Sequence, residues 1–273
     1  MQRGRLTILV YHDPPPATFE AHLRLLRRRY SLVALSDALD ALSGGATRLP
    51  PRPLAITLDD GHRGNIDLLE VLERLQVRAT IFLCSSIVGT GRRFWFDHAA
   101  DADHLKRVTD AERVEALRLR GLAEDADVGS DDALSAADIE VLGRAVDFGS
   151  HGKTHAILPR CDEPKARREI EESRVELGRR FGIDARLFAY PNGDYTEREI
   201  DLVHAAGYGF ALTVDAGFNT ATTHPLRLRR LGVDDVDGLA ELVVKASGLW
   251  AFLRRMRGDR RLHLVARRSR IDT

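Results

Sequence analysis

Leu54-Ala55-Ile56-Thr57-Leu58-Asp59-Asp60-Gly61-His62 is the stretch that decides the fold of this 273-residue chain. An apolar run suited to a buried strand is followed at once by two acids and a glycine, which form a turn signal. Other Asp-Asp pairs occur at 131–132 and 234–235, so the pair alone indicates little. Its position directly after a buried strand is distinctive, because buried carboxylates need a partner such as a cation.

A second polar segment, Ser150-His151-Gly152-Lys153-Thr154-His155, follows a strand-like run at 145–149. Imidazoles at positions i and i+4 lie on one face of a helical turn, as chelation requires. One carboxylate and two histidines form a ligand set that leaves positions open for water and substrate, as in catalytic zinc sites. With a second Asp free to act as a base, the two segments together predict metal-assisted hydrolysis.

The third segment is Phe188-Ala189-Tyr190-Pro191-Asn192-Gly193. Pro-Asn-Gly is turn chemistry, so the pattern predicts a strand that ends in a rigid loop. Such a loop can offer a backbone N–H, that of Asn192, to a developing oxyanion.

Strand-like runs alternate with helical patterns along most of the chain. Strands are predicted at 6–11, 32–35, 54–58, 78–83, 145–149, 185–190, 209–214 and 226–233, and helices at 18–29, 36–42, 65–75, 164–181, 196–207 and 239–256. This alternation favours an α/β fold with a parallel sheet, open or closed into a barrel. In such folds the chemistry lies at the carboxyl ends of the strands, which is where all three segments fall.

Residues 98–145 break this rhythm, because they are charged, Ala-rich and helical in period. We interpret them as a helical insertion within one barrel domain at 1–236, followed by an amphipathic helix and a basic tail at 237–273. From Lys245 onward the chain holds nine Lys or Arg and two Asp. This segment either contacts an anionic membrane surface peripherally or packs its apolar stripe on the barrel.

Composition excludes several classes of protein. Hydrophobic residues make up 44% of the chain, which is enough for a core, and the net charge of zero argues against a nucleic-acid partner. Two cysteines indicate reduced thiols. The apolar run at 6–10 is too short for a signal-peptide core, and no run is long enough to span a membrane. A cytoplasmic location is therefore expected, and the sequence carries no signal for an oligomeric state.

Taken in order, these motifs resemble those of the polysaccharide deacetylases, carbohydrate esterase family 4, also called the NodB-homology domain. The matching residues are Thr57-Leu58-Asp59-Asp60-Gly61, Ser150-His151-x-x-Thr154-His155 and Phe188-Ala189-Tyr190-Pro191-x-Gly193. The likeness extends to Tyr11-His12, Ala79–Leu83 and Trp95-x-Asp97, and covers about residues 6–235.

The resemblance implies a distorted (β/α) barrel of about seven strands and metal-dependent removal of acetyl groups from sugars. It makes Asp59 the general base, and it makes Asp60, His151 and His155 the ligands of a divalent metal, for which we expect Zn²⁺, with Co²⁺ or Ni²⁺ as alternatives. Asn192 would donate its backbone N–H to the oxyanion.

The expected substrate is an acetylated glycan, either a polysaccharide, an oligosaccharide or a lipid-linked glycan. Tyr190, Pro191 and Trp95 are the predicted substrate contacts, with Trp95 as a stacking surface for a sugar ring. Two alternatives remain open: a metal-dependent hydrolase of another non-peptide amide, and a catalytically impaired carbohydrate-binding homologue.

Three positions depart from the family pattern. Asn192 follows the proline of the third motif, where the family commonly has an aromatic residue. Ala189 stands where many members have an Arg that orients the base. The late Leu-x-His motif, whose His is the general acid, has no counterpart in the stretch Leu228-Arg229-Arg230-Leu231. We therefore assign the proton-donor step to His12, with His224 or Asp59 itself as alternatives.

Overall fold

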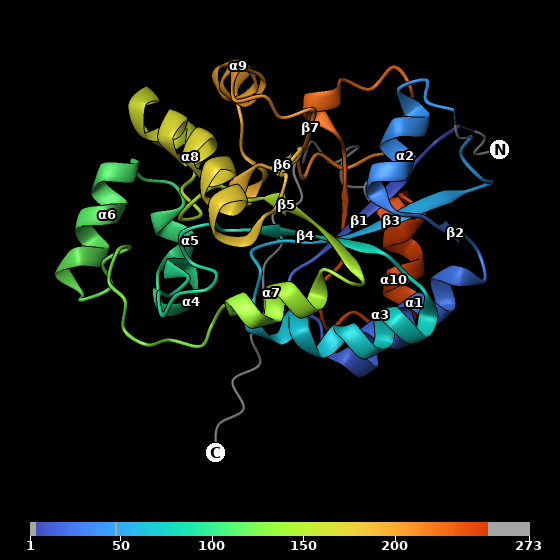
Figure 1. Ribbon diagram of the computed structural model, residues 1–273, viewed down its shortest axis with the longest axis horizontal. Helices are drawn as coiled ribbons and strands as arrows, with labels where there is room; N and C mark the ends of the chain where they lie inside the picture. Colours follow the sequence, from blue (N-terminus) through green and yellow to red (C-terminus); the bar gives the residue numbers. More distant parts are fainter. Residues whose placement is uncertain (1–3, 47, 251–273) are drawn as a thin grey trace.

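The computed structural model describes residues 4–46 and 48–250. A curled parallel sheet runs through the molecule, with helices packed around it (Figure 1). The strands are β1 (Thr7–Tyr11), β2 (Ser31–Leu32), β3 (Pro53–Leu58), β4 (Ala79–Leu83), β5 (Val146–Ser150), β6 (Leu187–Ala189), β7 (Phe210–Leu212) and β8 (Leu231–Gly232).

The helices alternate with these strands. The α-helices are α1 (Pro16–Arg27), α2 (Leu35–Leu42), α3 (Leu69–Leu75), α4 (Trp95–His98), α5 (Ala102–Leu105), α6 (Asp110–Leu119), α7 (Ala136–Leu142), α8 (Glu163–Phe181), α9 (Glu197–Ala205) and α10 (Leu239–Ala246). Short 3-10 helices are η1 (Arg63–Leu68), η2 (Leu158–Arg160), η3 (Pro191–Gly193) and η4 (Pro225–Arg227). Capping boxes formed by Ser135 with Asp138 and by Thr196 with Glu199 begin α7 and α9.

Seven strands follow the order β7-β6-β5-β4-β3-β1-β8, and β2 pairs with β3 from outside this path. A single parallel bridge between Leu212 and Leu228 links β7 to the segment that leads into β8. The sheet therefore curls into a distorted barrel, as predicted. All of its ladders are parallel, so the carboxyl ends of the strands meet at one edge.

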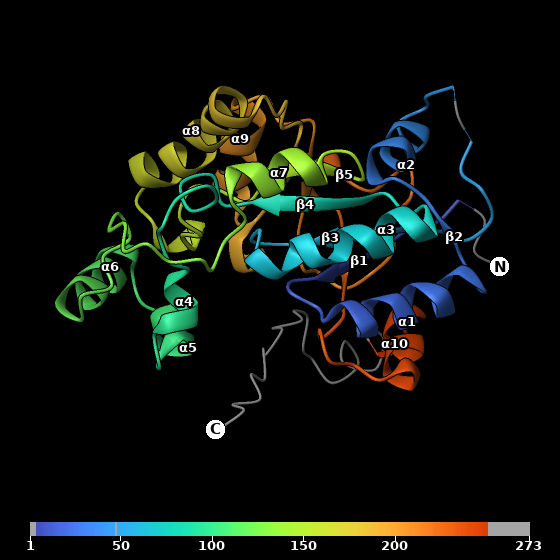
Figure 2. The same cartoon turned by 60° about the horizontal axis from the view of Figure 1, so that its bottom comes forward.

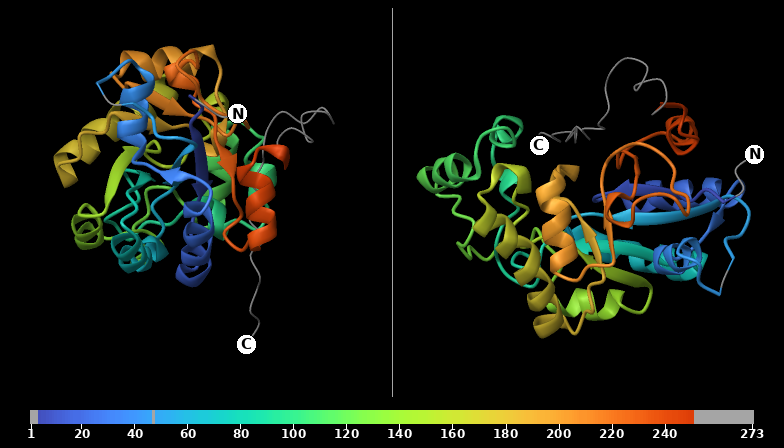
Figure 3. Two further views of the ribbon diagram at one scale, coloured as in Figure 1. Left: turned by 90° about the vertical axis from the view of Figure 1, so that its right-hand side faces the viewer. Right: turned by 90° about the horizontal axis from the view of Figure 1, so that it is seen from above.

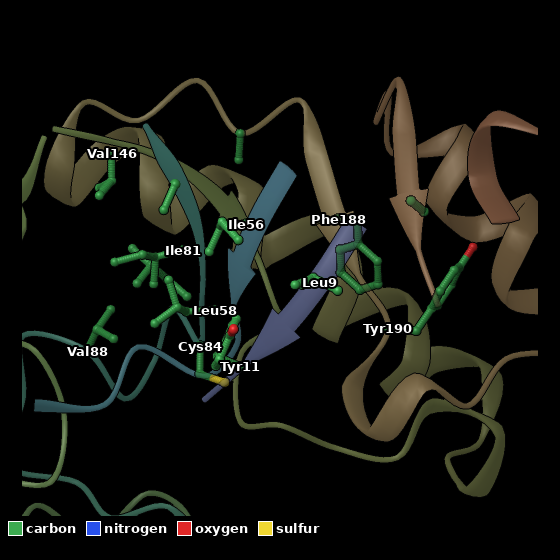
Figure 4. Close-up of a cluster of buried hydrophobic side chains, with 14 of the residues drawn as sticks. Leu9, Tyr11, Ile56, Leu58, Ile81, Cys84, Val88, Val146, Phe188 and Tyr190 are labelled. Atoms are coloured by element: carbon green, nitrogen blue, oxygen red, sulfur yellow. The ribbon is translucent and has the colours of Figure 1, made fainter. Parts of the chain in front are cut away.

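Alternate residues of the strands face the inside and the outside of the barrel. On β3, Leu54, Ile56 and Leu58 belong to the large core beneath the surrounding helices, part of which is drawn in Figure 4. Ala55 belongs instead to the smaller cluster that strands from around the barrel share with α2. Because Asp59 continues this inward alternation, the strand aims its carboxylate into the barrel.

The insertion is confirmed as helical. It contributes α5 to α7 before β5, and α4, which ends at the first residue of the insertion, lies with α5 and α6 at one end of the molecule (Figures 1 and 2). At the other end, α10 lies beside α1 (Figures 2 and 3), and the Tyr30 hydroxyl donates to the carbonyl of Ala246. Among the described residues, no helix is both long and apolar enough to cross a bilayer.

Four predicted elements differ from the structure. The helix predicted at 65–75 begins as the 3-10 helix η1, and the strand predicted at 32–35 keeps only Leu32, in β2. The strand predicted at 226–233 is divided into η4 and the short β8, because Pro225 begins a helical turn and Leu228 then bridges to β7. The helix predicted at 239–256 ends at Ala246, and residues 251–256 lie outside the described chain. The membrane contact and the cytoplasmic location therefore stay predictions.

Candidate metal-dependent active site

Asp60, His151 and His155 come together at the carboxyl edge of the barrel. One ligand atom from each lies within 4.8 Å of the others, and all three residues are buried. The Asp60 Oδ1 atom is 3.4 Å from His151 Nε2 and 3.3 Å from His155 Nε2. Asp60 follows β3 and both histidines follow β5, so two strand ends supply the whole cluster.

The donor atoms of this cluster suit a divalent cation. His151 Nδ1 lies 2.8 Å from the carbonyl of Ala189, which can only accept, so Nδ1 carries the hydrogen and the Nε2 of neutral His151 keeps its lone pair. Among the described residues, Asp60 Oδ1 has no hydrogen-bond partner, and the His155 ring nitrogen that faces it is Nε2, at 3.3 Å. A carboxylate oxygen and an imidazole lone pair that face each other in a buried site need a positive charge between them.

Residues of the three motifs have unusual backbone angles. Asp60 has φ 74°, His155 has φ 58° and Asn192 has φ 57°, all in the left-handed region that non-glycine residues rarely occupy. Such conformations cost about 1–3 kcal/mol each and persist only where surrounding contacts enforce them. Their concentration in the three predicted motifs is typical of a functional site.

Asp59 is fixed by a residue that the sequence analysis missed. The Arg230 guanidinium donates to both oxygens of Asp59 at 2.7 Å, and its Nε donates to the carbonyl of Thr213. Arg230 is fully buried and Asp59 is 3% exposed. Burial raises the pKa of the Asp59 carboxyl, but Arg230 and His151 outweigh it and hold the pKa below its usual value. Arg230 thus provides the cation that is missing at Ala189.

His62 is a second residue that the motif analysis overlooked. Its Nε2 lies 3.2 Å from Asp60 Oδ2, the oxygen that faces away from His151 and His155. Burial lowers the pKa of His62, but the carboxylates of Asp60 and Asp97 outweigh it and raise this pKa to about 9. Its position two residues after Asp60 was the available sequence signal.

The segment 151–155, here called the metal loop, is braced from two sides. Glu169 on α8 accepts the backbone N–H groups of Lys153 and Thr154 at 2.9 Å, and the Thr154 hydroxyl as well. From α4, the Trp95 indole N–H donates to the carbonyl of His155. Trp95 is 3% exposed, and its predicted contact with a sugar stays a prediction.

The loop after β6 lies next to the metal loop. A Cβ atom added at Gly152 would lie 3.6 Å from Pro191 Cγ, so the third motif borders the second. Tyr190 is buried, and its hydroxyl donates to the carbonyl of Leu226. The Asn192 side chain donates to Asp194 within the same turn.

His12 lies at the end of β1, beside Asp59. The Asp235 carboxylate accepts the N–H groups of His12 and of the next residue at 3.1 and 2.9 Å, and Asn65 donates to the His12 carbonyl at 2.8 Å. His12 is close enough to Asp59 to contribute to the low pKa of that carboxyl. His224 is instead exposed, at the start of η4.

A buried Asp-His-His cluster beside an ion-paired carboxylate, at the carboxyl edge of a parallel barrel, is typical of metal-dependent hydrolases. Comparison with family models narrows the class of hydrolase, because residues 46–211 match the polysaccharide deacetylase model. The chain therefore belongs to the polysaccharide deacetylase family. A comparison with curated protein sequences gives no match.

Solved structures agree with this fold. The Streptococcus pyogenes deacetylase PplD in complex with acetate has a TM-score of 0.67 at 16% identity, over 89% of this chain and 98% of that one. IcaB from Ammonifex degensii gives 0.64 at 20%, over 92% and 98%. A de-N-acetylase from Aggregatibacter actinomycetemcomitans gives 0.64 at 14%, over 88% and 98%. At these identities the likeness shows a shared fold.

Proposed function

We propose that this protein removes acetyl groups from N-acetylated sugars of a polysaccharide, an oligosaccharide or a lipid-linked glycan, with a divalent ion as cofactor. The observation that carries the proposal is the Asp60–His151–His155 cluster beside Asp59, a carboxylate held ionised by Arg230. Membership of the deacetylase family supports the reaction class and an acetylated glycan as substrate.

Asp60, His151 and His155 would hold the ion, for which we propose Zn²⁺. Bound there, a divalent ion would polarise a carbonyl oxygen and lower the pKa of a water molecule to about 7. Asp59 is the base, because Arg230 keeps it ionised and β3 aims it into the barrel. It accepts a proton from the water that attacks the acetamide carbon.

Asn192 and His12 complete the proposed reaction. The Asn192 backbone N–H donates to the oxyanion that forms as the new C–O bond is made. His12 donates a proton to the sugar nitrogen as the C–N bond breaks, which yields acetate and a free amine. Its position beside Asp59 favours His12 over the exposed His224 for this step. Tyr190 and Pro191 are proposed to border the acetyl group, because their loop adjoins Gly152.

The test is acetate release from N-acetylglucosamine oligomers by metal-stripped protein, before and after Zn²⁺ or Co²⁺ is added. We expect release only with metal, and Asp59→Asn should abolish release while metal still binds. Metal binding without acetate release from any acetamido sugar would contradict the proposal. A parallel screen of small non-sugar amides would then show whether the alternative hydrolase activity is present.

A further inference from the structure

The carboxylate of Asp60 uses its two oxygens in opposite directions. Oδ1 faces the Nε2 atoms of His151 and His155, where an ion would be held. Oδ2 lies 3.2 Å from His62 Nε2. A carboxylate oxygen accepts only, so the hydrogen in this contact belongs to His62. His62 is thus the donor to the metal-ligating side chain.

The His62 ring is itself held in place on its other side. Its Nδ1 lies 3.8 Å from Asp97 Oδ2, so both ring nitrogens face carboxylates. The ring packs against Phe94 at a centroid distance of 4.6 Å, and His62 is 8% exposed. Phe96, two residues further along the same turn, packs on the ring of His155 at 4.5 Å. The turn at 94–97 therefore contacts both His62 and a ligand of the cluster.

We propose that His62 is a positioning residue that orients Asp60 as a metal ligand. The terminal torsion of an aspartate is broad, so a carboxylate with no partner for its second oxygen samples many orientations. The backbone of Asp60 is in the left-handed region, which does not set the terminal torsion of its side chain. The direction of Oδ1 therefore depends on the contacts of the carboxylate. Removal of such an outer partner typically weakens metal binding by about 10–100-fold. The inference rests on the metal site of the proposed function.

Two amide variants test this role. In His62→Gln the side-chain amide takes the place of Nε2 and can still donate to Asp60 Oδ2, whereas in His62→Asn the amide is too short to reach it. Zn²⁺ affinity is measured by chelator competition on each purified protein. We expect His62→Asn to bind about 10–100-fold more weakly than the unaltered chain, and His62→Gln to recover most of that loss. The visible spectrum of bound Co²⁺ should change in the Asn variant.

His98→Asn is the matched control, because His98 also pairs with a carboxylate, that of Asp132, but contacts none of the three ligands. The Zn²⁺ affinity of the His98→Asn variant should be unchanged. Equal affinities of His62→Asn and His62→Gln, whether both normal or both weak, would overturn the role of the Nε2 hydrogen bond. If the unaltered protein binds metal and releases acetate, equal affinities of the two variants overturn the positioning role of His62 and leave the proposed function standing. If the unaltered protein binds no metal, the proposed function fails together with the role of His62.

Discussion

The most demanding prediction concerns the ion pair between Asp59 and Arg230. Both side chains are buried, and the guanidinium donates to both carboxylate oxygens at 2.7 Å. Arg230→Met keeps a long aliphatic chain in the barrel but removes the charge. It leaves Asp59 as a buried anion without its partner, and it also removes the donor to the carbonyl of Thr213.

The size of the effect follows from this geometry. Removal of one partner of a buried ion pair costs about 3–5 kcal/mol, because the remaining charge is left uncompensated. We expect this loss of unfolding free energy for Arg230→Met, and a similar loss for Asp59→Asn. The double variant removes both charges of the pair, so it should be no less stable than the worse single variant. The coupling energy between the two sites should therefore be at least about 3 kcal/mol.

The assay is denaturant unfolding of all four proteins in the presence of a chelator, so that bound metal does not contribute to stability. Arg229→Met is the matched control, because this neighbouring Arg is exposed, and its cost should stay within about 0.5 kcal/mol. Additive single-variant losses, with no coupling energy, would refute the argument that Arg230 exists to neutralise Asp59.

We make three other predictions, for His12, Glu169 and the two cysteines. His12→Gln should lower kcat for acetate release by about 10²–10⁴-fold and leave Zn²⁺ affinity unchanged; an unchanged kcat would exclude His12 as the proton donor. Glu169→Ala should lower the unfolding free energy by about 3 kcal/mol or more, because three donors of the metal loop lose their acceptor, and chemical denaturation measures this directly. Cys84 and Cys161 are buried and burial raises the pKa of both thiols, so a thiol reagent at pH 8 should label neither in the native protein and both in denaturant; labelling of the native protein would contradict the packing.

The ligand cluster could be predicted from sequence because each of its parts is local. Asp60, His151 and His155 sit in short motifs directly after strands, and parallel strands bring their carboxyl ends to one edge. The left-handed backbone of Asp60 and His155 could not be predicted in the same way. Non-glycine residues adopt it only under tertiary constraint, here from the contacts of the two loops.

The contact between Arg230 and Asp59 could not be predicted from the sequence for a different physical reason. Arg230 lies in the stretch predicted as one regular strand, which the structure divides into η4 and β8. The direction of a side chain in such a short closing segment depends on how β7 and β1 hold it, and this is long-range information. A long Arg side chain then crosses the barrel interior to reach Asp59. The family resemblance instead led us to expect an Arg at Ala189, on β6, and a His at the position of Arg230.

The central claim is that Asp60, His151 and His155 hold a divalent ion beside Asp59. The most direct test is an anomalous diffraction map, recorded at the zinc absorption edge from crystals of protein loaded with one equivalent of Zn²⁺. We expect one strong peak within bonding distance of Asp60 Oδ1 and the Nε2 atoms of both histidines, and loss of this peak in Asp60→Asn. A site without a peak, or a peak bound by other residues, would contradict the claim.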